Sequence, residues 1–169
     1  MDAVCLVGFM GAGKSAVGRE LADRLGWPLF DLDEEIETRE GRSVYDIFAD
    51  SGESYFRQKE REVLGELAGG NMVLSVGGGA YTVDDNINMI NKISSSVWLR
   101  CPIEVCLQRL AASSTKRPLF SDPEQMANLY QHRLKYYKRA RYHVDSEQGT
   151  PEEIALKIME LLGLRIEQK

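Results

Sequence analysis

Eight residues near the start of the chain carry the clearest chemical pattern in the sequence. Gly8-Phe9-Met10-Gly11-Ala12-Gly13-Lys14-Ser15 matches G-x-x-x-x-G-K-[ST] completely, between a short apolar run and an amphipathic stretch. Glycines let backbone N–H groups surround phosphate oxygens, and the helix N-terminus that follows attracts anions. Lys14 is expected to reach the β- and γ-phosphates, and Ser15 to ligate Mg²⁺. The pattern predicts binding of ATP.

Two acidic residues are candidates for the carboxylate that Mg²⁺ needs. The third apolar run ends in Ser75-Val76-Gly77, without the usual acid, whereas the second ends in Asp31-Leu32-Asp33. On an extended strand Asp31 and Asp33 point to the same side. One can then serve Mg²⁺ through water while the other holds or deprotonates an acceptor hydroxyl. Acids that favour the start of a helix over 34–40 explain the pair equally well.

Two arginines are candidates for binding an anionic substrate. Arg57 stands four residues after Glu53 and three before Glu60. This spacing fits either a surface ion-pair ladder or a guanidinium aimed at a carboxylate. Arg133 lies along the apolar face that Tyr130 and Tyr137 mark on a predicted helix. Arg133 there needs an anionic partner, or extends its charged end to water.

Two further features are candidates for contact with the ligands. Gly77-Gly78-Gly79-Ala80 directly follows a predicted strand. Three glycines exceed what a turn needs and indicate close approach of a ligand to the backbone. Arg117 lies in a stretch, 113–123, that lacks apolar periodicity and predicts a mobile loop. Arg117 is either a solvated loop residue or a cation that closes over the phosphates.

The elements that must position these residues alternate between strands and helices. An alternating order predicts right-handed crossovers and a parallel sheet that is covered on both faces, with ligands at the carboxyl ends of its strands. Predicted strands cover 3–7, 28–32, 72–76, 97–99 and 142–145, and predicted helices cover 14–25, 43–49, 56–67, 102–110, 123–141 and 151–162. Gly26 is a plausible stop for the first helix, and Thr150 with Pro151 a start for the last.

Composition narrows the class of protein. The chain has 169 residues, 43% hydrophobic and 28% charged, with a net charge of −5. This fits one soluble domain over residues 1–169, and the acidic balance argues against nucleic-acid binding. No apolar segment approaches a membrane span, and none resembles a secretory signal, so we expect a cytoplasmic protein. The formal charge and the lack of a strong exposed apolar stripe favour a monomer. Cys5, Cys101 and Cys106 lack metal-site spacing, and Cys5 and Cys101 are predicted in the core.

Taken together, these motifs resemble the shikimate kinases, over nearly the whole chain. The specific part runs from Asp31 to Glu60, where gluconate kinases and adenylate-kinase relatives differ. The resemblance rests on Gly11–Ser15, Asp31-x-Asp33, Glu34-Glu35-Ile36-Glu37, Gly41-Arg42-Ser43, Asp46-Ile47-Phe48, Gly52-Glu53, Phe56-Arg57-x-x-Glu60, Gly77–Ala80 and Arg117-Pro118-Leu119.

The resemblance implies a fold and a reaction. The fold is the three-layer α/β/α P-loop kinase fold, with a five-stranded parallel sheet in the order 2-3-1-4-5. A substrate-binding region spans about 33–61, and a mobile lid about 112–124. The reaction transfers the γ-phosphate of ATP to the 3-hydroxyl of shikimate, giving shikimate 3-phosphate and ADP in aromatic amino-acid biosynthesis.

It also implies roles for named residues. Shikimate contacts Asp33, Arg57, Gly78, Gly79 and Arg133, with both arginines on the carboxylate and Asp33 as hydroxyl ligand or base. Lys14 and Arg117 stabilise the phosphoryl group, and Ser15 holds Mg²⁺ with Asp31 through water. The nucleotide contacts Gly11, Ala12, Gly13, Lys14, Ser15, Ala16, Arg109, Arg117 and Pro151, with Arg109 and Pro151 near the adenine.

Two departures from the family pattern and two rival functions remain. The late helix reads Arg133-Leu134-Lys135-Tyr136-Tyr137, without the family's proline, and Ala16 replaces a common threonine. A kinase for another small polyol or sugar acid would keep the P-loop. A non-catalytic nucleotide-binding relative would be expected to lose chemical residues, yet Lys14, Ser15, Asp33, Arg57 and Arg117 are all present.

Overall fold

A five-stranded parallel sheet forms the centre of the computed structural model, which describes residues 3–67, 70–112 and 122–165. Each pair of neighbouring strands is parallel, in the order β2-β3-β1-β4-β5. The predicted fold and strand order are therefore confirmed. The strands are β1 (Val4–Val7), β2 (Leu29–Asp31), β3 (Val73–Ser75), β4 (Ser95–Arg100) and β5 (Tyr142–Asp145).

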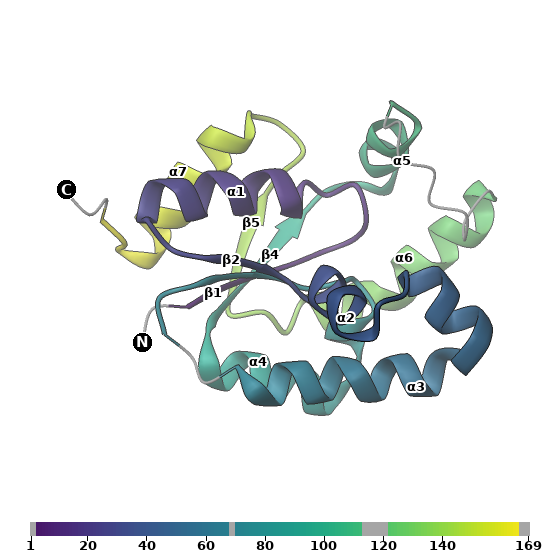
Figure 1. Cartoon of the computed structure of the whole chain (residues 1–169). Coiled ribbons are helices and arrows are strands. Elements are labelled where there is room, and N and C mark those ends of the chain that lie inside the picture. Colours follow the sequence, from purple (N-terminus) through teal and green to yellow (C-terminus); the bar gives the residue numbers. More distant parts are fainter. Residues whose placement is uncertain (1–2, 68–69, 113–121, 166–169) are drawn as a thin grey trace.

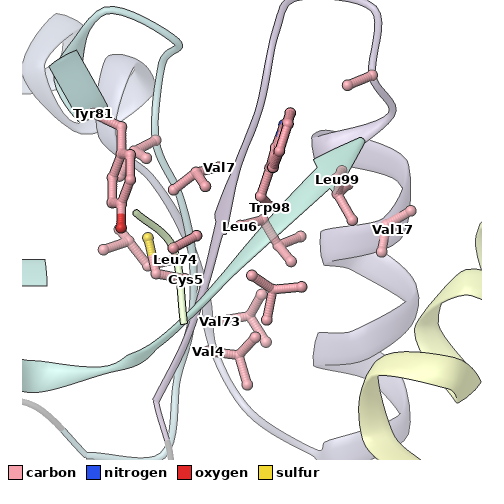
Figure 2. Close-up of a cluster of buried hydrophobic side chains, with 14 of the residues drawn as sticks. Val4, Cys5, Leu6, Val7, Val17, Val73, Leu74, Tyr81, Trp98 and Leu99 are labelled. Carbon is pink, nitrogen blue, oxygen red and sulfur yellow. The ribbon is translucent and has the colours of Figure 1, made fainter. Parts of the chain in front are cut away.

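The core lies on both sides of β1, because this strand is covered by helices on each face. All four of its residues are buried, and Cys5 pairs with Leu74 on β3 and Ser96 on β4. Figure 2 shows Val4, Leu6 and their neighbours gathered around the central strands. Such uninterrupted apolar runs are typical of parallel strands between two helical layers. The cysteines Cys5, Cys101 and Cys106 are all buried.

Helices form the outer layers of the fold. The first and last helices, α1 (Lys14–Leu25) and α7 (Pro151–Leu162), cover one face of the sheet, and α3 (Val44–Glu66) and α4 (Asp84–Ile93) lie on the other (Figure 1). Gly26 ends α1 in the left-handed conformation, and Thr150 begins α7 with a capping box, both as predicted. The remaining helices are α2 (Leu32–Glu40), α5 (Ile103–Ala112), α6 (Pro123–Tyr137) and the short 3₁₀ helix η1 (Ala80–Thr82).

The predicted helices require three corrections. Helix α4 was not predicted, since its sequence is rich in asparagine and buries only Asn86, Ile87 and Ile90. The helix predicted over 123–141 ends at Tyr137, where the N–H of Ala140 bonds to the Tyr137 carbonyl and the chain turns toward β5. The helices predicted over 43–49 and 56–67 form the single element α3, kinked at Gly52 (φ 80°).

Two further predictions concern membrane spans and the lid. None of the helices in the described ranges is long and apolar enough to cross a membrane. The predicted lid, 112–124, falls mostly on residues 113–121, which lie outside the described residues. Within that stretch is Arg117, one of the predicted catalytic residues.

Candidate active site

The phosphate loop joins β1 to α1 at the carboxyl end of the central strand. Its glycines Gly8, Gly11 and Gly13 have φ values of 151°, 80° and 101°, which L side chains rarely adopt. A Cβ at Gly11 would also lie 2.6 Å from the Cys106 carbonyl oxygen. Gly13 caps α1 without a side-chain hydrogen bond, and the first turn has no acid. The first N–H groups of α1 are therefore not capped by a side chain, which suits an anion.

The side chain of Lys14 folds back onto the start of the phosphate loop. Its Nζ donates to the carbonyl oxygens of Gly8 at 2.9 Å and Phe9 at 3.1 Å. The ammonium is thus held at the mouth of the loop, where phosphates would bind. Ser15 and Ala16 follow in the first turn of α1 with exposed side chains. The loop thus has positive-φ glycines, a lysine and an uncapped helix start within eight residues, which are features that suit an anion.

Arg109 connects the phosphate loop to the segment before α7. One guanidinium nitrogen lies 3.4 Å from the carbonyl oxygens of Gly11 and Ala12, and the other donates to Ser146 at 2.7 Å and Glu147 at 3.0 Å. The same segment leads to Pro151, the exposed first residue of α7. The structure thus places Arg109 beside the loop, with the approach to Pro151 on its other side.

Asp31 and Asp33 do not share a strand, which decides between the two alternatives in favour of the helix start. Strand β2 ends at Asp31, whose Oδ1 accepts from the backbone N–H of Asp33 at 3.0 Å and Glu34 at 3.3 Å. Asp31 is therefore the N-cap of α2, as the helix-start alternative described. Asp33 lies in the first turn of α2, and its carboxylate faces Gly77.

Each of the three consecutive glycines faces a different polar side chain of the candidate site. A Cβ at Gly77 would lie 3.1 Å and 3.2 Å from the carboxylate oxygens of Asp33. At Gly78 it would lie 2.8 Å from Nη1 of Arg133, and at Gly79 2.5 Å from Nη2 of Arg57. The glycines therefore let Asp33, Arg57 and Arg133 converge on one stretch of backbone, although they come from α2, α3 and α6.

Arg57 is more than part of a surface ladder, because one of its partners is buried. Its Nη1 donates to Oε2 of Glu60 at 2.6 Å, and Glu60 is only 1% exposed. Its Nη2 pairs with the exposed Glu53 at 3.2 Å. Burial lowers the pKa of Arg57, but the two carboxylates outweigh it and raise that pKa overall. The guanidinium is thus charged and fixed in position.

Glu60 connects the charges of the site. Burial raises its pKa from 4.5 to about 7, an effect that the nearby Arg57 limits. The negative charge of Asp33 raises this pKa further, and the positive charge of Arg133 lowers it. Glu60 therefore interacts electrostatically with Arg57, Asp33 and Arg133, and an anion bound between the two arginines would reduce their mutual repulsion.

Arg133 points into the site and not to water. Its guanidinium carbon lies 5.8 Å from the ring centroid of Phe9, and its Nη1 lies against Gly78. Phe9 belongs to the phosphate loop, and its ring packs edge-on against Tyr130 at 5.3 Å. The snorkelling alternative therefore does not describe Arg133. Phe9 brings this arginine next to the loop that would hold ATP.

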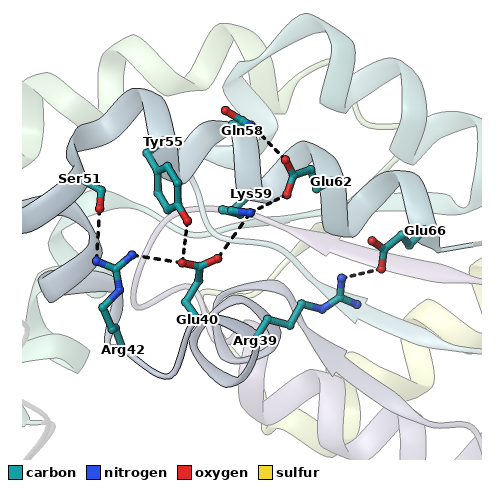
Figure 3. A network of polar contacts seen from close by, with 9 residues as sticks. All are labelled: Arg39, Glu40, Arg42, Ser51, Tyr55, Gln58, Lys59, Glu62 and Glu66. Carbon is teal, nitrogen blue, oxygen red and sulfur yellow. Dashed lines mark hydrogen bonds and ion pairs between the residues drawn. The ribbon is translucent and has the colours of Figure 1, made fainter.

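A polar network joins α2 to α3, the two helices that carry Asp33 and Arg57 (Figure 3). The Glu40 carboxylate at the end of α2 accepts from the hydroxyl of Tyr55 at 2.8 Å and from Arg42 at 3.1 Å, and pairs with Lys59 at 3.6 Å. Arg39 reaches across to Glu66 at 2.5 Å. The exposed pairs contribute little to stability individually, but several of them restrain the two helices.

Three residues of this site were not predicted as functional. Glu60 has the spacing from Arg57 that an ion pair on one helix needs, but a surface acid would have the same spacing. Only its burial distinguishes it from such an acid. Phe9 fills a variable position of the loop motif. Tyr137, whose hydroxyl donates to the carbonyl oxygen of Gly78 at 3.1 Å, was read as part of an apolar face. Buried polar or aromatic contacts across helices carry no local sequence signal.

The donor set around the loop fits Mg²⁺ bound mainly through nucleotide phosphates. Among the described residues, no three His, Cys, Asp or Glu side chains gather as a metal cluster. Mg²⁺ prefers hard oxygen ligands and keeps waters, so a serine hydroxyl, one carboxylate and phosphates suffice. Ser15 at the start of α1 and Asp31 at the end of β2 carry oxygens of this kind.

A phosphate loop beside two arginines and a carboxylate defines the class of protein: a P-loop kinase for a small, anionic acceptor. The family model described as shikimate kinase matches residues 10–163. A shikimate kinase from Cereibacter sphaeroides is 42% identical over 166 residues, covering 96% of this chain and 83% of that protein. Two solved structures are also similar over nearly their full length.

The first structure is described as shikimate kinase from Acinetobacter baumannii in complex with shikimate. It is 38% identical, with a TM-score of 0.88 over 96% of this chain and 93% of that chain. The second is shikimate kinase from Aquifex aeolicus, 39% identical, with a TM-score of 0.84 over 95% and 96%. The chain belongs to the shikimate kinase family. It is an ATP-dependent phosphotransferase of the shikimate pathway, which leads to the aromatic amino acids.

Proposed function

We propose that the site phosphorylates the 3-hydroxyl of shikimate, with Arg57 and Arg133 on its carboxylate and Asp33 at its ring hydroxyls. The observation that carries this proposal is the triple glycine. Gly77, Gly78 and Gly79 each lie within 3.2 Å, measured from an added Cβ, of one of these three side chains. Two guanidinium groups and one carboxylate around a backbone segment without side chains fit an acceptor with one carboxylate and several hydroxyls.

The geometry favours catalysis by positioning. Binding of the acceptor carboxylate by two cations holds the ring in one orientation, so that one hydroxyl faces the phosphate loop. Asp33 accepts the proton of that hydroxyl while the hydroxyl oxygen forms a bond to the γ-phosphorus of ATP. The bond between this phosphorus and the β–γ bridging oxygen breaks, and ADP leaves. Charge neutralisation by Lys14 supplements this positioning.

The proposed nucleotide site is built around the phosphate loop. The N–H groups at Gly11–Ala16 and the ammonium of Lys14 bind the phosphates, and Arg109 and Pro151 flank the adenine. Ser15, with Asp31 through water, would hold Mg²⁺, which when bound neutralises phosphate charge. Arg117, which lies outside the described residues, is proposed to approach the transferred phosphoryl group. We also propose that the chain acts as a monomer, as a single domain over residues 1–169, with the lid at 112–124.

Product analysis tests the proposal. The protein is incubated with Mg²⁺, ATP and shikimate, and ³¹P–¹H coupling in the product identifies the phosphorylated hydroxyl. Phosphate on the 3-hydroxyl, together with lack of turnover on gluconate under the same conditions, supports the proposed acceptor geometry. Phosphate on another hydroxyl, or equal turnover of gluconate, would show that the acceptor is held differently.

A further inference from the structure

The hydroxyl of Tyr137, at the end of α6, lies where the glycine segment meets Arg133. The side chain is fully buried, with its ring centroid 6.0 Å from that of Trp98. Its hydroxyl donates to the carbonyl oxygen of Gly78 at 3.1 Å. The proposed function assigns this bond no role, although it reaches the backbone of the acceptor site.

The same hydroxyl also adjoins the guanidinium of Arg133. A Cβ at Gly78 would lie 2.5 Å from the Tyr137 oxygen and 2.8 Å from Nη1 of Arg133, so both groups converge on one α-carbon. Burial raises the pKa of Tyr137 to about 12, and the charge and hydrogen bond of Arg133 lower it in part. The hydroxyl therefore keeps its proton near neutral pH and can donate to Gly78 while accepting from Arg133.

The bond from Tyr137 engages a carbonyl that would otherwise compete for Arg133. The Gly78 carbonyl is a strong acceptor beside a cation, and a partly buried carbonyl without a partner is costly. Without the hydroxyl, the guanidinium would turn to this oxygen. The Phe9 ring on its other side restrains Arg133 only weakly, because a cation–π contact at 5.8 Å has little directionality.

We propose that Tyr137 is a positioning residue for the acceptor: its hydroxyl engages the Gly78 carbonyl and so keeps the Arg133 guanidinium directed at the substrate carboxylate. This inference rests on the proposed role of Arg133. It predicts that loss of the hydroxyl weakens acceptor binding and leaves the nucleotide site intact.

The test compares Tyr137→Phe with a matched control, Tyr81→Phe. Tyr81 is equally buried, and its hydroxyl contacts Asn91 at 3.1 Å and Ser96 at 3.3 Å within the core. Y137F should raise the KM for shikimate about ten-fold, the equivalent of one hydrogen bond of about 1.4 kcal/mol. Its kcat and its KM for ATP should stay near wild type. Y81F should change neither KM, with a comparable loss in Tm.

A double-mutant cycle tests whether Tyr137 acts on shikimate binding through Arg133. If Tyr137 acts through Arg133, the variant R133A/Y137F should have the same shikimate KM as R133A alone. A wild-type KM for Y137F, or a full additional rise on the R133A background, would overturn the inference. An R133A protein with wild-type KM would instead refute the proposed role of Arg133 itself, so the two failures are distinguishable.

A second variant keeps the inference testable if Y137F folds poorly. Gly78→Ala places a methyl group against the same hydroxyl and guanidinium from the backbone side. All variants are assayed well below the lowest measured Tm. A raised shikimate KM with unchanged ATP KM in G78A is the expected result. A wild-type shikimate KM in G78A would contradict the crowded geometry on which the inference stands.

Discussion

Replacing Gly79 by alanine would test how closely Arg57 approaches the glycine segment. The new methyl carbon would lie 2.5 Å from Nη2, 2.9 Å from Nη1 and 3.0 Å from Cζ of Arg57. The backbone of Gly79 (φ −79°, ψ −34°) suits alanine, and the three atoms nearest to the new methyl group all belong to the guanidinium. Because an arginine tip can move, the fold should persist, and the cost should appear in the site.

The size of the effect follows from what holds Arg57. To restore an ordinary contact of 3.4 Å, Nη2 must retreat by about 0.9 Å, whereas Glu60 holds Nη1 at 2.6 Å and Glu53 holds Nη2 at 3.2 Å. Such a shift stretches a charge-assisted hydrogen bond, which contributes about 1.5–3 kcal/mol. At about 1.4 kcal/mol per factor of ten, the shikimate KM of G79A should rise about 10- to 100-fold.

Steady-state kinetics with each substrate varied in turn measures this change. The control is Gly65→Ala, since a Cβ at Gly65 in α3 meets only Met89 at 3.8 Å, an ordinary contact. G65A should keep both KM values and gain about 0.5–1 kcal/mol from the loss of a helical glycine. A G79A protein with the shikimate KM of wild type would refute the reasoning, because Arg57 would then not face the acceptor across Gly79.

Three further predictions concern the charged groups of the site. Arg133→Ala should raise the shikimate KM about 10- to 100-fold with little effect on the ATP KM; equal changes in both would contradict its role. Asp33→Asn should lower kcat about 100-fold or more while the circular dichroism spectrum is unchanged; near-normal turnover would exclude Asp33 as the base. Glu60 has its pKa raised from 4.5 to about 7, so the native state binds a proton that the unfolded chain has released. Wild-type stability should therefore fall as pH rises from 4.5 through 7, by at most about 3 kcal/mol. In thermal scans, the Tm of Glu60→Gln should rise relative to the wild-type Tm as pH increases over this range. A Tm difference that does not change with pH would contradict the raised pKa of Glu60.

Structural features that depend on a few neighbouring residues were predicted well. The phosphate loop combines glycine conformation, a lysine and a helix start within eight residues, so its pattern identifies it without tertiary contacts. Strand and helix ends at Gly26, Thr150 and Asp145 follow the same local chemistry. Helix α4 was missed because asparagine-rich sequence has low helix propensity, and tertiary packing of Ile87 and Ile90 overrides it.

Features that depend on distant segments were predicted only as alternatives. For Asp31 and Asp33, an extended strand and a helix start fitted equally well, because the sequence does not show that the helix begins between them. The triple glycine indicated close approach to the backbone, but not that Asp33, Arg57 and Arg133 approach it from three helices. The burial of Glu60 and the bond from Tyr137 to Gly78 arise only when α3 and α6 pack on the sheet.

The central claim is that two arginines recognise the carboxylate of the acceptor and so orient it for transfer. The most direct measurement compares ADP release with shikimate and with its carboxamide, which keeps the shape and removes the charge. We predict that kcat/KM for the carboxamide is lower by about 100-fold or more, since two charge-assisted contacts are lost. Equal kcat/KM for the two compounds, or the same rate of ADP release without any acceptor, would contradict the claim.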